Sequence, residues 1–165
     1  HYPLRRQRQM CIRDRSKDGQ ARHKGLEFSI NGRLADKWNI LGGFSHMSAK
    51  QEKTTKGTLD GIRVNGTSEW TAVLGLEYNP NEAWSILGRA IYTGKTPVMN
   101  EKIWAPGYTI FDLGVTHKTH FGKIPAELSL MVNNVFDKDY WQVSRGNQVY
   151  LSLPRTFSFT AKLHF

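Results

Sequence analysis

Some short motifs in this chain contain residue types that can hold a phosphate or a metal ion. Residues 88–96 read GRAIYTGKT, which is close to a phosphate-binding loop. That loop needs four residues between its glycines and a helix after them, so that backbone amides surround the phosphate. Here five residues separate Gly88 from Gly94, and the flanking pattern is that of a strand. We therefore interpret this stretch as the end of a strand and not as a nucleotide site.

The candidate metal ligands and catalytic groups are sparse. His117 and His120 lie close together in the sequence, but no cysteine follows them, and Asp137 and Asp139 fit the start of a loop better than a metal site. The chain has no Gly-x-Ser-x-Gly elbow and no pair of carboxylates placed for acid–base work. We therefore expect no metal site, no cofactor and no catalysis.

The positive charge is concentrated near the N-terminus. The 165 residues carry a net charge of +9, and residues 1–24 contain eight Lys and Arg against two acidic residues. Only +3 remains for the rest of the chain, which argues against a nucleic-acid-binding face. Residues 1–15, which include the only cysteine, Cys11, show no strand alternation. We interpret them as an unstructured, non-native leader before a domain at 16–165; a genuine basic loop is the alternative.

Alternating apolar and polar residues predict an all-β chain of seven strands. Successive side chains of a strand point to opposite faces, so each alternating segment has one apolar and one polar face. No run approaches eighteen apolar residues, so no transmembrane helix is expected. The expected strands cover residues 26–34, 38–44, 70–78, 84–92, 111–116, 126–133 and 156–165.

The connections between these strands alternate in length. Short turns are expected at residues 35–37, 79–82 and 120–125, and long connections at 48–69, 94–107 and 137–153. Outer-membrane barrels have short periplasmic turns and long extracellular loops. Aromatic residues near both ends of the strands fit the two interfaces of a bilayer; they are Trp38, Trp70, Tyr78, Trp84 and Tyr92. The pattern favours a transmembrane β-barrel over a soluble sandwich.

Three segments together resemble a known family. Residues 132–141 read VNNVFDKDYW and residues 153–165 read LPRTFSFTAKLHF, while 21–34 and 105–118 read ARHKGLEFSINGRL and APGYTIFDLGVTHK. This arrangement resembles the C-terminal barrel of TonB-dependent outer-membrane receptors, especially ferric-siderophore receptors, over about residues 20–165. The matching positions near the C-terminus are Asn133, Asn134, Phe136, Asp137, Lys138, Tyr140, Pro154, Arg155 and Phe165.

The resemblance implies an antiparallel meander that forms an incomplete wall of a transmembrane β-barrel, which has about twenty-two strands in the family. The plug domain and coupling motif of the family are absent from these residues, so we expect a C-terminal fragment. The implied location is the outer membrane of a Gram-negative bacterium, with the C-terminus in the periplasm. The implied function is energy-coupled import of a ferric siderophore, which is the transported ligand and not a cofactor.

The resemblance also implies partners and binding residues. The partners are the ferric siderophore, the TonB–ExbB–ExbD system acting through a plug, the barrel-assembly machinery with Phe165 as its signal, and outer-membrane lipid, with no nucleic acid. Aromatic and cationic side chains in the long loops suit large, flat, anionic iron chelates. The candidates are Arg63, Trp104, Tyr140, Trp141 and Arg145. The alternatives are a passive porin or autotransporter barrel and, less favoured, a soluble ligand-carrying β-barrel.

Overall fold

The computed structural model describes residues 19–144 and 148–165, so the expected leader at 1–15 lies outside the described residues. The seven long strands are β1 (Gln20–Ala35), β2 (Trp38–Glu52), β3 (Trp70–Asn81), β4 (Trp84–Thr93), β7 (Tyr108–Phe121), β8 (Ile124–Asn133) and β11 (Thr156–Leu163). The short elements are the 3₁₀ turn η1 (Thr55–Gly57) and the strands β5 (Thr96–Val98), β6 (Ile103–Ala105), β9 (Trp141–Val143) and β10 (Val149–Leu151).

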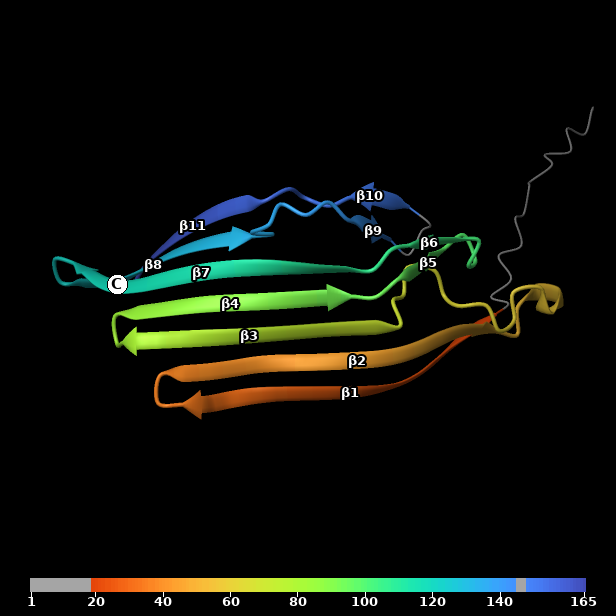
Figure 1. The fold of residues 1–165 in the computed structure, drawn as a ribbon, viewed down its shortest axis with the longest axis horizontal. Helices are drawn as coiled ribbons and strands as arrows, with labels where there is room; N and C mark the ends of the chain where they lie inside the picture. The colour runs from red at the N-terminus through yellow and green to blue at the C-terminus, as the bar shows by residue number, and fades with distance from the viewer. Residues whose placement is uncertain (1–18, 145–147) are drawn as a thin grey trace, which may run out of the picture.

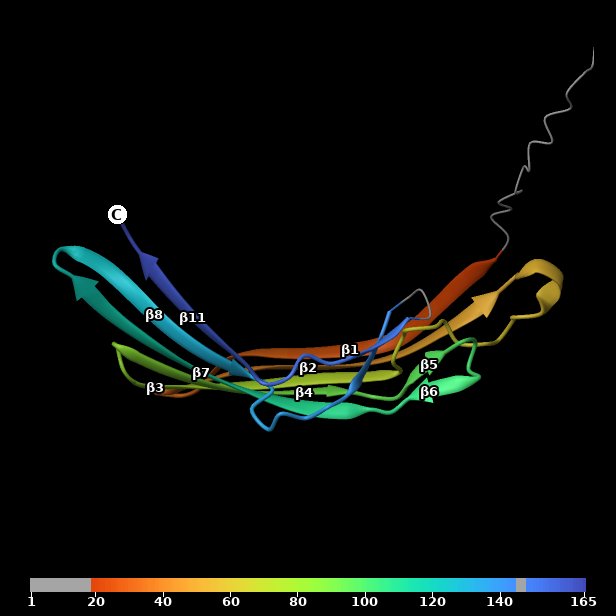
Figure 2. The same cartoon turned by 90° about the horizontal axis from the view of Figure 1, so that it is seen from above.

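The seven long strands form one antiparallel sheet in the order β1-β2-β3-β4-β7-β8-β11, so the expected meander is confirmed. Figure 1 shows the strands side by side from β1 to β11, and Figure 2 shows that the sheet is a single curved layer. Within the described residues, β1 pairs with β2 and β11 pairs with β8, but β1 and β11 do not pair with each other. The sheet is therefore an open wall and not a closed barrel.

The connections separate by length to the two ends of the sheet, as expected. Tight turns at 36–37, 82–83 and 122–123 lie at one end (Figure 1, left), and the three long connections lie at the other. We call that second end the loop end. The turn expected at 79–82 is shorter than predicted, because β3 continues to Asn81 through a register irregularity after Tyr78. The side-chain Oδ1 of Asn81 then accepts hydrogen bonds from the amides of Ala83 and Trp84, which closes the turn.

Two strands are longer than the sequence pattern predicted. β1 begins at Gln20 instead of residue 26, and β2 continues to Glu52 instead of ending at residue 44. The pairing runs without interruption to Gln20 opposite Glu52, and Arg22 Nη2 lies 3.1 Å from Glu52 Oε2 across the two strands. These ends are polar on both faces, so alternation of hydrophobicity carries no signal there.

The register places the apolar side chains of neighbouring strands on one face. Directly opposite residues of antiparallel strands share a face, and the pairs Phe28–Phe44 and Leu130–Phe159 are both of this kind. Leu130 is 43% exposed and Phe159 is 68% exposed, although both are strongly apolar. The buried apolar side chains of the described residues are few and small: Ala49, Pro97, Val98, Ala105 and Ala126. The sheet therefore has an exposed apolar face in place of a packed core, which suits a wall in contact with lipid.

The opposite face carries polar pairs between strands. Thr116 and Ser129 lie 3.0 Å apart, and Ser85 donates a hydrogen bond of 2.8 Å to Glu77. Lys162 and Glu127 form an exposed ion pair of 3.4 Å. The predicted division into an apolar and a polar face is therefore confirmed.

Aromatic pairs lie near both ends of the apolar face. Trp38 packs against Tyr78 in a tilted arrangement with ring centroids 4.7 Å apart near the tight turns, and His46 packs in the same way against Trp70 at 4.1 Å near the loop end. Trp38 and His46 are eight positions apart on β2, which corresponds to about 26 Å along a strand. That separation is comparable with the apolar band of about 25 Å in outer-membrane barrels.

Within the described part of the chain, no helix is long and apolar enough to cross a membrane.

Candidate functional site

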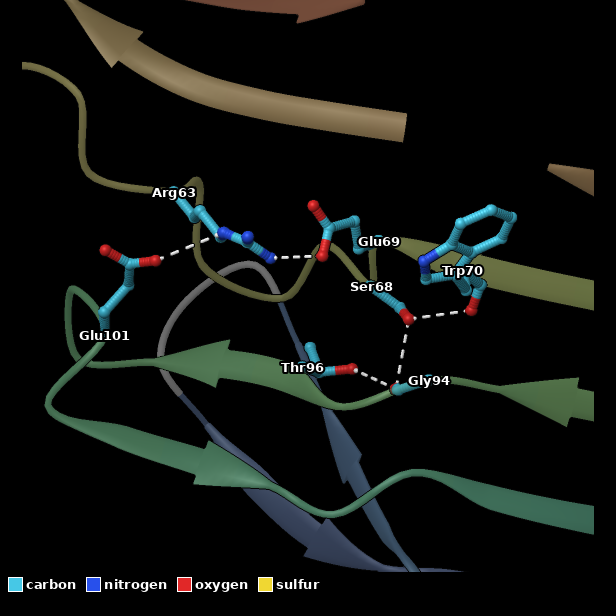
Figure 3. A network of polar contacts seen from close by, with 7 residues as sticks. All are labelled: Arg63, Ser68, Glu69, Trp70, Gly94, Thr96 and Glu101. Carbon is cyan, nitrogen blue, oxygen red and sulfur yellow. Dashed lines mark hydrogen bonds and ion pairs between the residues drawn. The ribbon is translucent and has the colours of Figure 1, made fainter. Parts of the chain in front are cut away.

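A charged cluster around Arg63 lies at the loop end of the sheet. The Nη1 of Arg63 donates a hydrogen bond of 2.7 Å to Glu69 Oε2, and its Nε lies 3.3 Å from Glu101 Oε1 (Figure 3). These two carboxylates come from different connections, because Glu69 precedes β3 and Glu101 lies between β5 and β6. Two negative charges therefore surround one guanidinium, and the three side chains together carry −1.

Trp104 on β6 completes this cluster. The guanidinium carbon of Arg63 lies 5.5 Å from the centre of the Trp104 ring, and the Nζ of Lys95 lies 4.8 Å from it. A cation within about 6 Å of an indole ring is attracted by the negative charge of its face. Trp104 is therefore held between cationic neighbours as part of the loop scaffold. We call Arg63, Glu69, Lys95, Glu101 and Trp104 the Arg63 cluster.

Amide and backbone hydrogen bonds fix the first long connection on the β5–β6 hairpin. Asn65 Oδ1 accepts a hydrogen bond of 2.8 Å from the amide of Asn100, and Asn65 Nδ2 donates to Asn100 Oδ1 at 3.2 Å. The amide of Gly66 donates to the carbonyl of Pro97 at 3.0 Å, and Pro97 is fully buried. Two connections that are far apart in the sequence are thus joined into one layer.

Ser68 ties the same layer to the ends of β3 and β4. Its hydroxyl lies 3.0 Å from the carbonyl oxygen of Gly94 and 2.9 Å from that of Trp70, and Thr96 Oγ1 donates to Gly94 at 3.3 Å (Figure 3). Ser68 and Thr96 also border a cavity, which is lined in addition by residues of the long strands and of the β9–β10 hairpin.

This cavity, which we call the loop-end cavity, has a volume of ≈ 400 Å³. The strands contribute residues of the polar face, since Thr71 pairs with Thr93 and Thr93 pairs with Tyr108. The third long connection contributes residues on both strands of its hairpin. The residues around the cavity are Gly66, Ser68, Thr71, Thr93, Thr96, Tyr108, Trp141, Gln142, Val143 and Tyr150.

A motif in the third long connection sets where that hairpin begins. Asn134 follows β8 with a φ of 53°, its amide donates 2.9 Å to Asp112 Oδ1, and its own Oδ1 accepts the amide of Lys138 at 2.9 Å. Asp137 Oδ1 accepts the amide of Arg155 at 2.7 Å, which joins the two ends of the connection. The VNNVFDKDYW and LPR segments therefore act as a clamp at the base of the connection, and Asp137 has the structural role that the sequence suggested.

Metal-binding geometry is absent from the described residues, where no three His, Cys, Asp or Glu side chains are grouped to hold an ion. His117 instead stacks on Trp84 with ring centroids 4.1 Å apart.

Comparison with known proteins shows to which protein family this chain belongs. A family model described as TonB dependent receptor-like, beta-barrel matches residues 11–135. The chain belongs to the TonB-dependent receptor β-barrel family. This family consists of outer-membrane receptors and not of enzymes. The match favours a receptor over the porin, autotransporter and soluble-carrier alternatives.

Relatives of this TonB-dependent receptor chain are named as siderophore receptors. It is 26% identical over 163 residues to the catecholate siderophore receptor Fiu of Escherichia coli K12, covering 91% of this chain and 20% of Fiu. It is 25% identical over 135 residues to the probable TonB-dependent siderophore receptor PiuA of Acinetobacter baumannii, covering 74% of this chain and 18% of PiuA. The chain thus spans about a fifth of the length of the curated relatives it matches.

The fold comparison agrees with this assignment. The crystal structure of BauA, the ferric preacinetobactin receptor of Acinetobacter baumannii, superimposes with a TM-score of 0.80 at 25% identity, over 88% of this chain and 22% of BauA. The expectation of a partial wall of a TonB-dependent receptor barrel is therefore confirmed.

The structure divides the five predicted ligand-binding residues of this receptor chain. Trp141 borders the loop-end cavity, and Tyr140 stacks on Tyr108 with ring centroids 3.9 Å apart. Arg63 and Trp104 belong to the Arg63 cluster, and Arg145 lies outside the described residues. Whether any of them contacts a ligand stays a prediction, as does the assembly role of Phe165, which follows the end of β11 and is 99% exposed.

Of the ten residues that border the cavity, sequence reasoning named only Trp141; the nine that it missed include Thr93, Tyr108 and Tyr150. A signal for two of them existed. Thr93 and Tyr108 lie at the loop ends of their strands on the polar parity, so the register of β4 and β7 brings them together. Tyr150 carried no such signal, because the β9–β10 hairpin that positions it is only three residues per strand.

Proposed function

We propose that this chain is part of the barrel wall of an energy-coupled outer-membrane receptor that imports a ferric siderophore. The observation that carries the proposal is the match of residues 11–135 to the TonB-dependent receptor barrel, together with a one-layer sheet whose apolar face is exposed. The names of Fiu, PiuA and BauA support a ferric siderophore as the transported ligand. The siderophore and its iron are cargo, and the proposal needs no resident cofactor.

The orientation follows from the connections. The loop end, which holds the Arg63 cluster and the loop-end cavity, faces the outside of the cell, and the tight turns face the periplasm. The strand β11 runs from the loop end toward the turns, so His164 and Phe165 lie on the periplasmic side. A ligand arriving from outside meets the loop end first.

The transport partners follow from the family assignment. Energy reaches the ligand through a plug domain that lies outside these 165 residues and is moved by the TonB–ExbB–ExbD system. The remaining partners are outer-membrane lipid on the apolar face and the barrel-assembly machinery, for which Phe165 is the proposed signal. Nucleic acid has no part in this proposal.

Uptake of radioactive iron tests the function. The gene for the complete receptor is deleted, and cells grown without iron are supplied with ⁵⁵Fe as a ferric catecholate, a ferric hydroxamate or ferric citrate. We expect uptake of at least one chelate to require both the receptor and an intact TonB protein. Receptor-independent uptake of all three chelates would contradict siderophore import, and receptor-dependent uptake without TonB would favour a passive channel.

A further inference from the structure

We propose that the loop-end cavity binds an uncharged, ring-bearing part of the siderophore and not its anionic iron centre. The proposal rests on the proposed function, because it names the chemical group that the same end of the receptor recognises. It is carried by three independent observations: the chemistry of the residues around the cavity, the exposure of their rings, and the neutralised state of the nearby guanidinium.

The residues around the cavity carry no formal charge. They supply the hydroxyl groups of Thr71 and Thr93 and the amide of Gln142, with no Lys, Arg, His, Asp or Glu among them. The hydroxyls of Ser68 and Thr96 also border the cavity, but they already donate to backbone carbonyls and can only accept from a ligand. Hydroxyl and amide groups both donate and accept hydrogen bonds. They therefore suit phenol and amide groups, whereas an anion needs cationic or concentrated N–H donors to offset its loss of water.

Aromatic residues from both faces of the β9–β10 hairpin border the cavity, because Tyr150 shares a face with Gln142 whereas Trp141 shares the opposite face with Leu151. Trp141 is 48% exposed and Tyr150 is 51% exposed although both border the cavity, so neither ring has its surface fully covered by this chain. Tyr108 is held in place by stacking on Tyr140 at 3.9 Å. Trp and Tyr rings offer large, rigid contact area for another ring, which fits a planar aromatic group in the cavity.

The nearby guanidinium of Arg63 does not make the cavity attractive to an anion. Arg63 is within 2.7 Å of Glu69 and 3.3 Å of Glu101, so its charge is already matched by two carboxylates. With Lys95, which lies 4.8 Å from the Trp104 ring, the Arg63 cluster has two cations and two carboxylates, so it offers no net positive charge to an anionic iron centre. The anion is thus directed to other parts of the receptor mouth, and this wall contacts its uncharged periphery.

The volume is compatible with this occupant. An apolar cavity of about 150 Å³ is sufficient for one benzene ring. The ≈ 400 Å³ of the loop-end cavity therefore accommodates a ring together with a hydroxyl and an amide substituent.

Two small probes that differ only in charge test the proposal on the purified complete receptor in detergent. The probes are 3-hydroxybenzamide, which is neutral at pH 7, and 3-hydroxybenzoate, which is an anion. Ligand-observed NMR titration gives their affinities. We expect the amide to bind more tightly than the benzoate, and Trp141→Leu and Tyr150→Leu each to weaken amide binding by about three- to ten-fold. The matched control, Trp84→Leu, removes an aromatic ring that stacks on His117 near the tight turns and should leave amide binding unchanged.

A second variant, which should gain affinity for the benzoate, distinguishes a change at the cavity from a general loss of the fold. Thr93→Lys places a cation among the residues around the cavity and should reverse the preference, so that the benzoate binds more tightly than the amide. Tighter benzoate binding to the unmodified receptor, no amide binding, or an equal loss in Trp84→Leu would each overturn the proposal. Because the probes contain no iron, failure of siderophore uptake with normal amide binding would count against the proposed function alone. Normal uptake without amide binding would count against the cavity proposal alone.

Discussion

Arg89 on β4 and Asp112 on β7 form an ion pair across the polar face, with Arg89 Nη2 2.7 Å from Asp112 Oδ2. The other carboxylate oxygen of Asp112 accepts the amide of Asn134, so one side chain that is 3% exposed joins three strands of the wall. Through Asn134, this pair also anchors the clamp at the base of the third long connection. The position of the β9–β10 hairpin over the loop-end cavity therefore depends on a residue in the body of the sheet.

Replacement of Asp112 tests this dependence. Asp112→Asn leaves Arg89 without its ionic partner and should destabilise the complete receptor by about 1–3 kcal/mol, discounted because the Arg89 side chain is 37% exposed. The control Glu127→Gln breaks the exposed pair with Lys162 and should cost about 0–1 kcal/mol. Denaturant titration in detergent measures both values. Equal costs would show that Asp112 has no special role.

Adjacent residues on β8 test which face contacts lipid. Leu130 lies on the apolar face and Ser129 on the polar face, where it is 3.0 Å from Thr116. Leu130→Arg should cost roughly 2–4 kcal/mol if the site is near the bilayer midplane, because the charge meets hydrocarbon. Ser129→Arg should cost much less, because its side chain points toward the wet interior. Unfolding in lipid vesicles gives the comparison, and a larger cost for Ser129→Arg would reverse the assignment of faces.

Labelling of intact cells tests the orientation. Thr58 lies in the first long connection and Asp36 in a tight turn at the opposite end of the sheet. In a complete receptor without other accessible cysteines, Thr58→Cys should react with a membrane-impermeant maleimide. Asp36→Cys should react only after the outer membrane is opened. Labelling of Asp36→Cys alone on intact cells would invert the proposed topology.

The first long connection should respond to acid through Asp60. The backbone amide of Thr54, and then its hydroxyl, donate to Asp60 Oδ1 at 2.8 Å each and hold the pKa of Asp60 below its ordinary value of 3.8. A lowered pKa means that this contact contributes fully above the unfolded pKa of about 3.9 and is lost as the pH falls through the lowered value. A carboxyl ¹³C titration, assigned with Asp60→Asn, should therefore show ionised Asp60 at pH 4. A midpoint above 3.9 would contradict this contact.

The strands of the wall were well predicted from the sequence, because hydrophobicity that alternates with a period of two residues shows which face of a strand is apolar and which is polar. Phe28, Phe157 and Phe159 alternate with polar neighbours, and the structure places all three on the apolar face. The residues from Gln20 to Gly25 show no such alternation of hydrophobicity, because they are mostly polar on both faces. Their extended conformation follows from the pairing with β2, which residue type does not show.

The candidate site was less predictable, because it depends on contacts between separate connections. From the sequence, Arg63 was predicted to be a cation that contacts the ligand. In the structure it is paired with two carboxylates, and the second of these, Glu101, belongs to the second long connection. Trp141 and Tyr140 were predicted from their residue types, whereas Tyr150 reaches the cavity only through the short β9–β10 hairpin. Such contacts follow from register and loop path, which residue type alone does not specify.

The separation of tight turns from long connections has a consequence for how length can change in this chain. A residue inserted at 36–37 would shift one strand by a single step, and every following side chain of that strand would move to the opposite face. Residues inserted between 53 and 60 would leave the pairing of β2 with β3 intact, because that part of the connection precedes the residues, from Gly61 onward, that hydrogen-bond to β2. We therefore expect insertions and deletions to be tolerated at the loop end and penalised at the tight turns, so that the long connections can be remodelled while the wall keeps its register.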